Sequence, residues 1–468
     1  MTRRDLSTLV VVSSSVLAMS VQSGAQAPPT AWRQIAYLKA STPGMFDHFG
    51  EGGALDGHSG GSVAVSADGN TLAVAAFWES SGATGVNGNQ ADKSIPQSGA
   101  VYVFTRSGGT WTQQAYIKAS NTGMAAVGGV PGDGDQFGFS VALSGDGNTL
   151  AVGATNEDSN ASGINGSQAD DSATGAGAVY VYTRTANTWA QQAYIKSDSP
   201  PAATAGDLFG YSVALNANGN TLAVGAYDEG GSARTVNGPI DAMRNGSGAG
   251  YVFTRNGSTW SREAYIKTWN AEGGDSWGVF VALSDDGNTL ALGSLDEDCL
   301  CTGVIHNASE VGATDQKANT SSGAAAIFVR TGTAWAQQAY VKASNTGVED
   351  WFGIRLALSG DGNTLAVVAP NEDSAALGTN GRQDDEAATE SGAAYVFTRN
   401  GTTWAQQAYV KGSNTEAYDE FGGAIALSRD GRTMAVGARG EDSVAPGVNG
   451  NQADNSLDES GAAYVFTR

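Results

Sequence analysis

One short run of residues recurs six times along the chain, and this recurrence constrains the fold more than any other feature. The run SVALSGDGNTLAVGA begins at Ser140, and edited copies begin at Ser62, Ser212, Phe280, Arg355 and Ala424. Successive copies lie about 70 residues apart, which is too long for a helical solenoid repeat and suits one propeller blade of four strands. The sequence therefore predicts an all-β chain folded as a single β-propeller.

Each copy contains four short apolar segments that we expect to form the four strands of one blade. In the second copy these segments are 140–144, 149–154, 178–183 and 189–196. Val, Tyr, Ile and Trp suit strands, and no segment has the apolar period of a helix. A Gly-Asp-Gly-Asn run joins the first two segments and a short turn at 185–187 joins the last two, so we predict two hairpins.

The two ends of the repeat array are incomplete in complementary ways. Residues 32–39 (WRQIAYLK) have the pattern of a lone fourth strand, and residues 462–468 (AAYVFTR) end on a third strand that lacks its fourth. We expect the N-terminal strand to complete the last blade, which pairs two open sheet edges and closes a ring of six four-stranded blades. The alternative is a truncated ring of seven blades.

The first 27 residues have the pattern of a secretory signal peptide. They combine Arg3 and Arg4 with a short apolar run at 9–19 and an Ala-x-Ala cleavage site at 25–27. The run is too short and too polar to span a membrane permanently, so we expect a periplasmic, cell-surface or secreted protein. The paired arginines also suit the twin-arginine route, and both export routes stay open. The propeller then occupies residues 28–468, with approximate repeats at 41–118, 119–196, 197–267, 268–342, 343–411 and 412–468.

Charge and cysteine content exclude several functions. The formal net charge is −22, whereas nucleic acid and anionic membranes both require a basic face on their partner. The acidity itself is equally explained by solubility or by adaptation to a salty medium. The only cysteines, Cys299 and Cys301, are too few for a structural zinc site, and the sequence leaves open whether they form a local disulfide.

A Phe-Gly pair opens most of the copies, as at 137–138, 209–210, 352–353 and 421–422. Trp277-Gly278 replaces it in the fourth copy, and an insertion at 51–60 follows Phe49-Gly50 in the first. Together with Gly-Ala pairs such as Gly153-Ala154, these residues resemble the FG-GAP repeat of integrin alpha-subunit propellers and their bacterial relatives. The resemblance covers essentially the whole mature chain and implies the propeller fold. It implies much less about function, because propellers host binding, scaffolding and catalysis alike.

One departure from the family concerns calcium. Many FG-GAP repeats carry a D-x-D-x-D-G-x-x-D loop after the Phe-Gly pair, whereas each copy here has one carboxylate in that interval, such as Asp146 or Asp361. One carboxylate cannot supply the six or more oxygens that Ca²⁺ prefers. We therefore expect these residues to form turns, and the calcium sites of the family are not carried over.

The strand order places two sets of long, variable and acidic loops at the same end of the ring. These are the connections from the second to the third strand and from the fourth to the first, and binding sites usually lie on such loops. Their recurring text, Asn-Glu-Asp-Ser and then Asn-Gly-x-Gln-x-Asp, has two interpretations: oxygen ligands for Ca²⁺ or caps for turns. The calcium candidates are Glu157, Asp158, Asn165, Asp170, Glu372, Asp373, Asp384, Glu441, Asp442 and Asp454.

No catalytic constellation stands out in the sequence. The three histidines, His48, His58 and His306, lie beside no recognisable nucleophile, and Gly-x-Ser-x-Gly and His-Glu-x-x-His motifs are absent. Carboxylates are too abundant to mark an acid and base pair. We therefore expect an exported, non-enzymatic binding or adhesion module that recognises a protein or glycan through the long loops, with Ca²⁺ as a candidate cofactor. The rival is an extracellular polysaccharide hydrolase or lyase on the same scaffold.

Overall fold

The computed structural model describes residues 35–45, 47–50, 62–123, 134–198, 206–311 and 320–468. The chain divides into two compact units, Met1–Leu38 and Lys39–Arg468. The expected signal peptide, residues 1–27, lies outside the described residues, and the described part of the first unit has no helix or strand. In the described ranges, no helix is long and apolar enough to cross a membrane.

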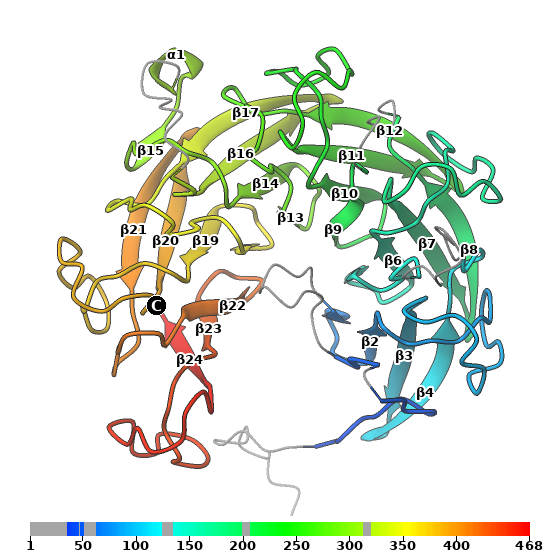
Figure 1. Ribbon diagram of the computed structural model, residues 1–468, viewed down its shortest axis with the longest axis horizontal. Coiled ribbons are helices and arrows are strands. Elements are labelled where there is room, and N and C mark those ends of the chain that lie inside the picture. Colours follow the sequence, from blue (N-terminus) through cyan, green and yellow to red (C-terminus); the bar gives the residue numbers. More distant parts are fainter. Residues whose placement is uncertain (1–34, 46, 51–61, 124–133, 199–205, 312–319) are drawn as a thin grey trace, which may run out of the picture. The chain divides into compact units, whose positions relative to one another are not determined.

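The second unit contains six antiparallel sheets, which we number as blades 1 to 6 along the chain (Figure 1). Blade 1 consists of β1 (Val63–Val65), β2 (Thr71–Ala76), β3 (Ala100–Ser107) and β4 (Thr110–Ile117). Blade 2 consists of β5 (Ser140–Leu143), β6 (Thr149–Ala154), β7 (Ala178–Thr185) and β8 (Thr188–Ile195). Blade 3 consists of β9 (Phe209–Leu215), β10 (Thr221–Ala226), β11 (Ala249–Asn256) and β12 (Thr259–Ile266).

The other three blades repeat this plan with small changes. Blade 4 consists of β13 (Phe280–Leu283), β14 (Thr289–Ser294), β16 (Ala324–Thr331) and β17 (Ala334–Val341), with an added strand β15 (Val304–Ile305) on β17 and a short helix α1 (Ala308–Val311). Blade 5 consists of β18 (Leu356–Leu358), β19 (Thr364–Ala369), β20 (Ala393–Asn400) and β21 (Thr403–Val410). Blade 6 consists of β22 (Phe421–Leu427), β23 (Thr433–Ala438) and β24 (Ala462–Thr467). The predicted all-β propeller is confirmed.

The sixth blade has three strands in the described part of the chain. β24 pairs with β23, and the sheet order ends there. Of the closing strand predicted at 32–39, residues 32–34 lie outside the described residues and residues 35–39 are not in a strand. Closure of the ring by this segment therefore stays a prediction.

Neighbouring blades share their apolar side chains. Val103 on β3 of blade 1 and Val141 on β5 of blade 2 belong to one buried cluster, and the same cluster contains Phe137 and Tyr180. Ala and Gly alternate with Val and Leu on the second strands, as in TLAVGA of β6. Small residues on one sheet therefore admit large side chains from the next, as expected for close-packed interiors.

A backbone contact repeats at the first five blade junctions. The amide of the Phe or Trp that opens each new blade donates to a carbonyl of the blade before it: Phe137 to Ser98, Phe209 to Ala176, Trp277 to Ser247, Phe352 to Ser322 and Phe421 to Ser391, at 3.0–3.2 Å. The residue after each acceptor is a glycine with positive φ, such as Gly177 at +75°. A Cβ on Gly177 would lie 2.2 Å from the carbonyl oxygen of Phe209, so only glycine allows the two backbones this close.

A polar contact also joins the outer parts of neighbouring blades. Arg184 of blade 2 donates to Gln114 and to Thr71 of blade 1, each at 3.1 Å, and its guanidinium lies over Trp189. The indole of Trp189 donates to the same Gln114 oxygen at 2.9 Å. Arg255 and Arg399 make equivalent contacts in blades 3 and 5.

The connections between strands differ sharply in length. The first-to-second and third-to-fourth connections are tight turns, and Asp146 forms one of them by accepting hydrogen bonds from Ser144 Oγ at 2.5 Å and Asn148 N at 2.9 Å. The long connections run from second to third strands and from fourth to first strands. Because strands alternate in direction, these long connections emerge at the same end of every blade. We call them together the long-loop face.

Candidate functional site

A buried ion pair anchors each second-to-third connection in the first five blades. A glutamate three residues after the second strand meets the lysine that directly follows the fourth strand, and both side chains are buried. The pairs are Glu79–Lys118 (3.0 Å), Glu157–Lys196 (2.6 Å), Glu229–Lys267 (3.0 Å), Glu297–Lys342 (2.9 Å) and Glu372–Lys411 (2.7 Å). Two of the calcium candidates, Glu157 and Glu372, therefore face an ammonium group supplied by the chain itself.

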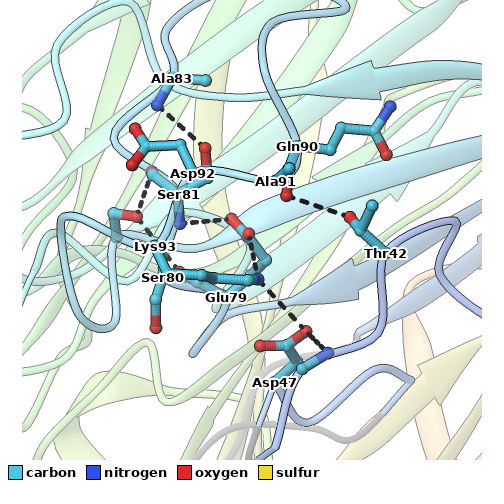
Figure 2. Close-up of polar contacts among 12 residues, drawn as sticks. Thr42, Asp47, Glu79, Ser80, Ser81, Ala83, Gln90, Ala91, Asp92 and Lys93 are labelled. Atoms are coloured by element: carbon cyan, nitrogen blue, oxygen red, sulfur yellow. Dashed lines mark hydrogen bonds and ion pairs between the residues drawn. The ribbon is translucent and has the colours of Figure 1, made fainter.

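Blade 1 adds a second ammonium group to this arrangement. Figure 2 shows Lys93 next to Glu79 and Asp47, with Nζ 2.9 Å from Glu79 Oε1 and 3.8 Å from Asp47 Oδ2. Burial disfavours the charged form of Glu79, but Lys118 and Lys93 outweigh this and hold its pKa below the ordinary value. The carboxylate is therefore a fixed structural anion and not a free acid or base.

In blades 1, 2, 3 and 5, the Asn-Gly pair of the second-to-third connection is hydrogen-bonded to the fourth strand. Asn165 has φ +57°, its amide donates to the carbonyl of Tyr194 at 2.7 Å, and its side-chain oxygen accepts the amide of Tyr194 at 3.0 Å. Asn87, Asn237 and Asn380 make the same side-chain contact with Tyr116, Tyr265 and Tyr409. The oxygen of Asn165 that was a calcium candidate thus serves as a strand-edge acceptor.

In blades 2, 5 and 6, the aspartate that follows the glutamate three residues after the second strand accepts a backbone hydrogen bond from the far half of the same loop. Asp158 accepts the amide of Gly175 at 2.8 Å, Asp373 accepts that of Glu390 at 2.7 Å, and Asp442 accepts that of Glu459 at 2.7 Å. The remaining candidates make local contacts: the exposed Asp170 and the half-buried Asp454 cap turns at Ser172 and Ser456, and the exposed Asp384 pairs with Arg382. Nowhere in the described ranges do three or more His, Cys, Asp or Glu side chains form a group arranged to hold a metal ion.

One set of acidic residues on this face was missed by sequence reasoning. An aspartate lies two residues before the Phe-Gly pair and is buried beside the Glu-Asp pair of the following blade. Burial and then the charges of Glu157 and Asp158 raise the pKa of Asp135 to about 8. The pKa is likewise raised to about 7 at Asp207 and Asp350 and to about 6 at Asp419, with burial as the first cause. The available signal was the recurrence of Asp-x-Phe-Gly at this spacing.

Apolar side chains on the surface concentrate on the same loops. Apart from two residues of the first unit and three valines on β1 and β24, every strongly exposed large apolar side chain of the described chain lies on the long-loop face. These residues are Met45, Met243, Leu300, Val348, Leu377, Tyr418, Val444, Val448 and Leu457. These residues do not recur at equivalent positions from blade to blade. Each loop therefore exposes different side chains, although the contacts that hold the loops are similar.

The cysteines and histidines have structural partners. Cys299 and Cys301 form a disulfide within the long loop of blade 4. The ring of His48 packs against Trp78 with centroids 4.3 Å apart, and His306 Nε2 accepts the amide of Trp404 at 3.1 Å. His58 lies outside the described residues.

Comparison with solved structures finds similar chains at low sequence identity and low TM-score. The β-propeller domain of Cps50 (Swd1) from Myceliophteria thermophila is 9% identical, with 82% of this chain and 81% of that one covered and a TM-score of 0.41. The periplasmic gluconolactonase PpgL from Pseudomonas aeruginosa is 15% identical (81% and 78% covered, TM-score 0.42), and Sqt1 from Saccharomyces cerevisiae is 10% identical (82% and 70%, TM-score 0.41). Such low TM-scores carry no conclusion about what this protein binds.

Comparison at the sequence level is more specific for the repeat itself. No curated protein matches this chain. The FG-GAP repeat family matches at residues 335–397 and 404–466, which cover the fourth strand of blade 4 through the third strand of blade 5 and the corresponding part of blades 5 and 6. Two stretches of this chain thus match the FG-GAP repeat, and they lie on the last three blades of the β-propeller.

Proposed function

We propose that this protein is an exported, non-enzymatic binding or adhesion module that recognises an extracellular protein or glycan through the long-loop face. The observation that carries the proposal is the distribution of exposed apolar groups. Side chains such as Met243, Leu377 and Tyr418 are exposed on these loops, and none of comparable size is exposed on the short turns of the described chain. Exposed apolar groups surrounded by polar residues are typical of interaction surfaces.

The anchoring contacts support a binding role for this face. In blade 2, the buried ion pair, the Asn165 contact and the Asp158 hydrogen bond fix the second-to-third loop to its blade, and most of the other blades have some of these contacts. A loop that is already ordered loses little conformational entropy when it binds a partner, so more of the contact energy appears as affinity. The variable residues between these contacts then determine which partner is bound.

The rival function is an extracellular polysaccharide hydrolase or lyase. Such an enzyme needs an acid and a base poised near a substrate, and raised pKa values make Asp135 and Asp350 the candidates on this face. Each of them accepts a backbone hydrogen bond, from Gly123 N at 3.2 Å and Gly347 N at 2.6 Å, and is buried behind its loop. Their position favours a structural role over substrate contact.

The experiment is a panel of glycans and extracellular proteins screened for binding, run in parallel with a turnover screen on polysaccharides. We expect binding without turnover. Met243→Ser and Leu377→Ser should weaken the binding, whereas Asn187→Ser on an exposed third-to-fourth turn should leave it unchanged. Turnover of a polysaccharide that is lost in Asp135→Asn would instead establish the enzyme.

A further inference from the structure

In the described part of the chain, the buried glutamate of blade 6 lacks the lysine partner that its counterparts in blades 1 to 5 have. Glu441 is 4% exposed and accepts hydrogen bonds from Asn414 Nδ2 at 3.0 Å and Ser443 N at 3.1 Å, like its counterparts. In blades 1 to 5 the equivalent glutamate also pairs with a buried lysine at 2.6–3.0 Å. No such lysine or arginine pairs with Glu441 among the described residues, and a buried carboxylate without a counter-charge is strongly destabilising.

Among the described residues, Gly461 of blade 6 also lacks the close backbone neighbour that its counterparts in blades 1 to 5 have. Gly461 follows Ser460 and has φ +73°. The glycines at the five junctions between blades 1 and 6 likewise have positive φ, from +69° to +77°. At those junctions a Cβ on the glycine would lie 2.1–2.2 Å from the backbone of the next blade, whereas on Gly461 its nearest neighbour is 3.4 Å away, in Arg439 of the same blade. A hollow of about 380 Å³ lies here, lined by Gly437, Gly461 and adjacent alanines.

Blades 6 and 1 each expose a valine whose counterpart in another blade is buried. Val465 on β24 is 65% exposed, but its counterpart Val103 in blade 1 is fully buried. Val63 on β1 is 51% exposed, but its counterpart Val141 in blade 2 is 6% exposed. Val103 and Val141 belong to one apolar cluster, so the same packing would bury Val465 against Val63.

The segment 39–50 has the features of the linker found at the other junctions. Lys39 precedes Phe49 by ten residues, as Lys267, Lys342 and Lys411 precede Trp277, Phe352 and Phe421. Gly44 N donates to Asp47 just as Gly347 N donates to Asp350, and Glu416 N to Asp419. Gly50 N donates to Ala75 O at 2.9 Å, matching Gly138 N and Gly153 O in blade 2.

This linker therefore already engages the blade that follows it. In the described ranges, neither Lys39 nor Phe49 makes a hydrogen bond or ion pair with blade 6. We propose that segment 39–50 docks on blade 6 of its own chain, with the Lys39 ammonium on Glu441 and the Phe49 amide on the Ser460 carbonyl. A segment on the same chain has a high effective concentration at this surface, which favours it over a second copy. The inference does not depend on which ligand the long-loop face binds.

A double-mutant cycle in the full chain tests the ion pair. Lys39 is exposed in the structure, so Lys39→Met alone should leave Tm unchanged if the contact does not form. If it forms, Lys39→Met lowers Tm by several degrees, and adding Glu441→Gln restores most of the loss because no buried charge is left unpaired. Lys196→Met with Glu157→Gln in blade 2 is the matched control. If Lys196→Met lowers Tm and Lys39→Met does not, the proposal is wrong.

Hydrogen exchange on the unmodified protein gives a second test that needs no variant. The amide of Phe49 should exchange as slowly as that of Phe137, which donates to Ser98 at 3.2 Å. Fast exchange at Phe49 would contradict docking. If protection of Phe49 and Tm both rise with protein concentration and the chain elutes as an oligomer, the occupant is a second copy and the intramolecular proposal is wrong.

Discussion

Asp135, on the long-loop face, is a buried carboxyl group that lies close to other carboxyl groups. It is buried next to Glu157, Asp158 and Asp171, and the ammonium groups of Lys118 and Lys196 also interact with it. Burial is the main reason that its pKa rises to about 8. In blade 1, Lys93 occupies the sequence position of Asp171, and Asp47 has an ammonium neighbour instead of a third carboxylate.

The raised pKa of Asp135 predicts how stability depends on pH. The folded protein keeps the proton on Asp135 up to about pH 8, whereas the unfolded chain loses it near the ordinary value of 3.8. The folded state therefore binds more protons between these values, and this residue makes stability fall as pH rises from 4 to 8. Asp135→Asn should flatten the fall in Tm across this window. An unchanged pH profile in the variant would contradict the assignment.

Calcium is the proposed cofactor of the same face and is tested at the same residues. A divalent cation relieves repulsion among crowded carboxylates, so millimolar Ca²⁺ should raise Tm relative to chelator at matched ionic strength. We expect the rise to shrink in Asp135→Asn/Asp158→Asn/Asp171→Asn and to persist in Asp146→Asn, whose carboxylate serves only its own turn. A rise that survives in the triple variant excludes these loops, and no rise in the wild type excludes calcium.

At the scale of the element, an ion pair beside the fourth strand holds the second-to-third loop of each of the first five blades. Lys196 at the end of β8 is buried against Glu157 at the start of the loop. Lys196→Met leaves a buried carboxylate unpaired and should cost about 3–5 kcal/mol of unfolding free energy. Lys196→Met/Glu157→Gln should cost much less. Chemical denaturation of the three variants measures this, and equal losses in the single and double variants would contradict the coupling.

The blade junctions also depend on specific polar side chains. Arg184 donates through two different nitrogens to Gln114 and Thr71 while stacking on Trp189. A lysine carries the same charge but cannot make this forked contact, so Arg184→Lys should cost about 1–2 kcal/mol. Chemical denaturation of Arg184→Lys and of the exposed control Asn187→Ala measures this loss of unfolding free energy. Equally small losses in the two variants would show that a positive charge alone is enough to stabilise the junction.

The sequence predicted the strands of each blade but not the role of the acidic loop residues. The hairpins could be predicted because their turns and apolar alternation are local, as at 140–154. The ion pair of Glu157 joins residues 39 positions apart, and local patterns do not report such contacts. Its signal was present, since Glu79 and Lys118, and Glu372 and Lys411, have the same separation. The buried Asp135 was missed because its neighbours come from the following blade.

At the scale of the whole molecule, one scaffold presents six different loops at the same end of its blades. The buried anchors repeat, while exposed side chains such as Met243 and Leu377 change from blade to blade. This separation of constant support from variable surface is what a binding module requires. The central claim is therefore that the long-loop face, and not the opposite end of the blades, contacts the ligand.

Selective blocking of the two ends tests this claim most directly. Both native cysteines are in a disulfide, so one introduced cysteine gives a unique thiol for attaching a bulky polymer. Leu377→Cys places the polymer on the long-loop face, and Asn187→Cys places it on a short turn. We predict that the labelled Leu377→Cys protein loses binding to its protein or glycan ligand while the labelled Asn187→Cys protein keeps it. Full binding by the first together with loss in the second would contradict the account.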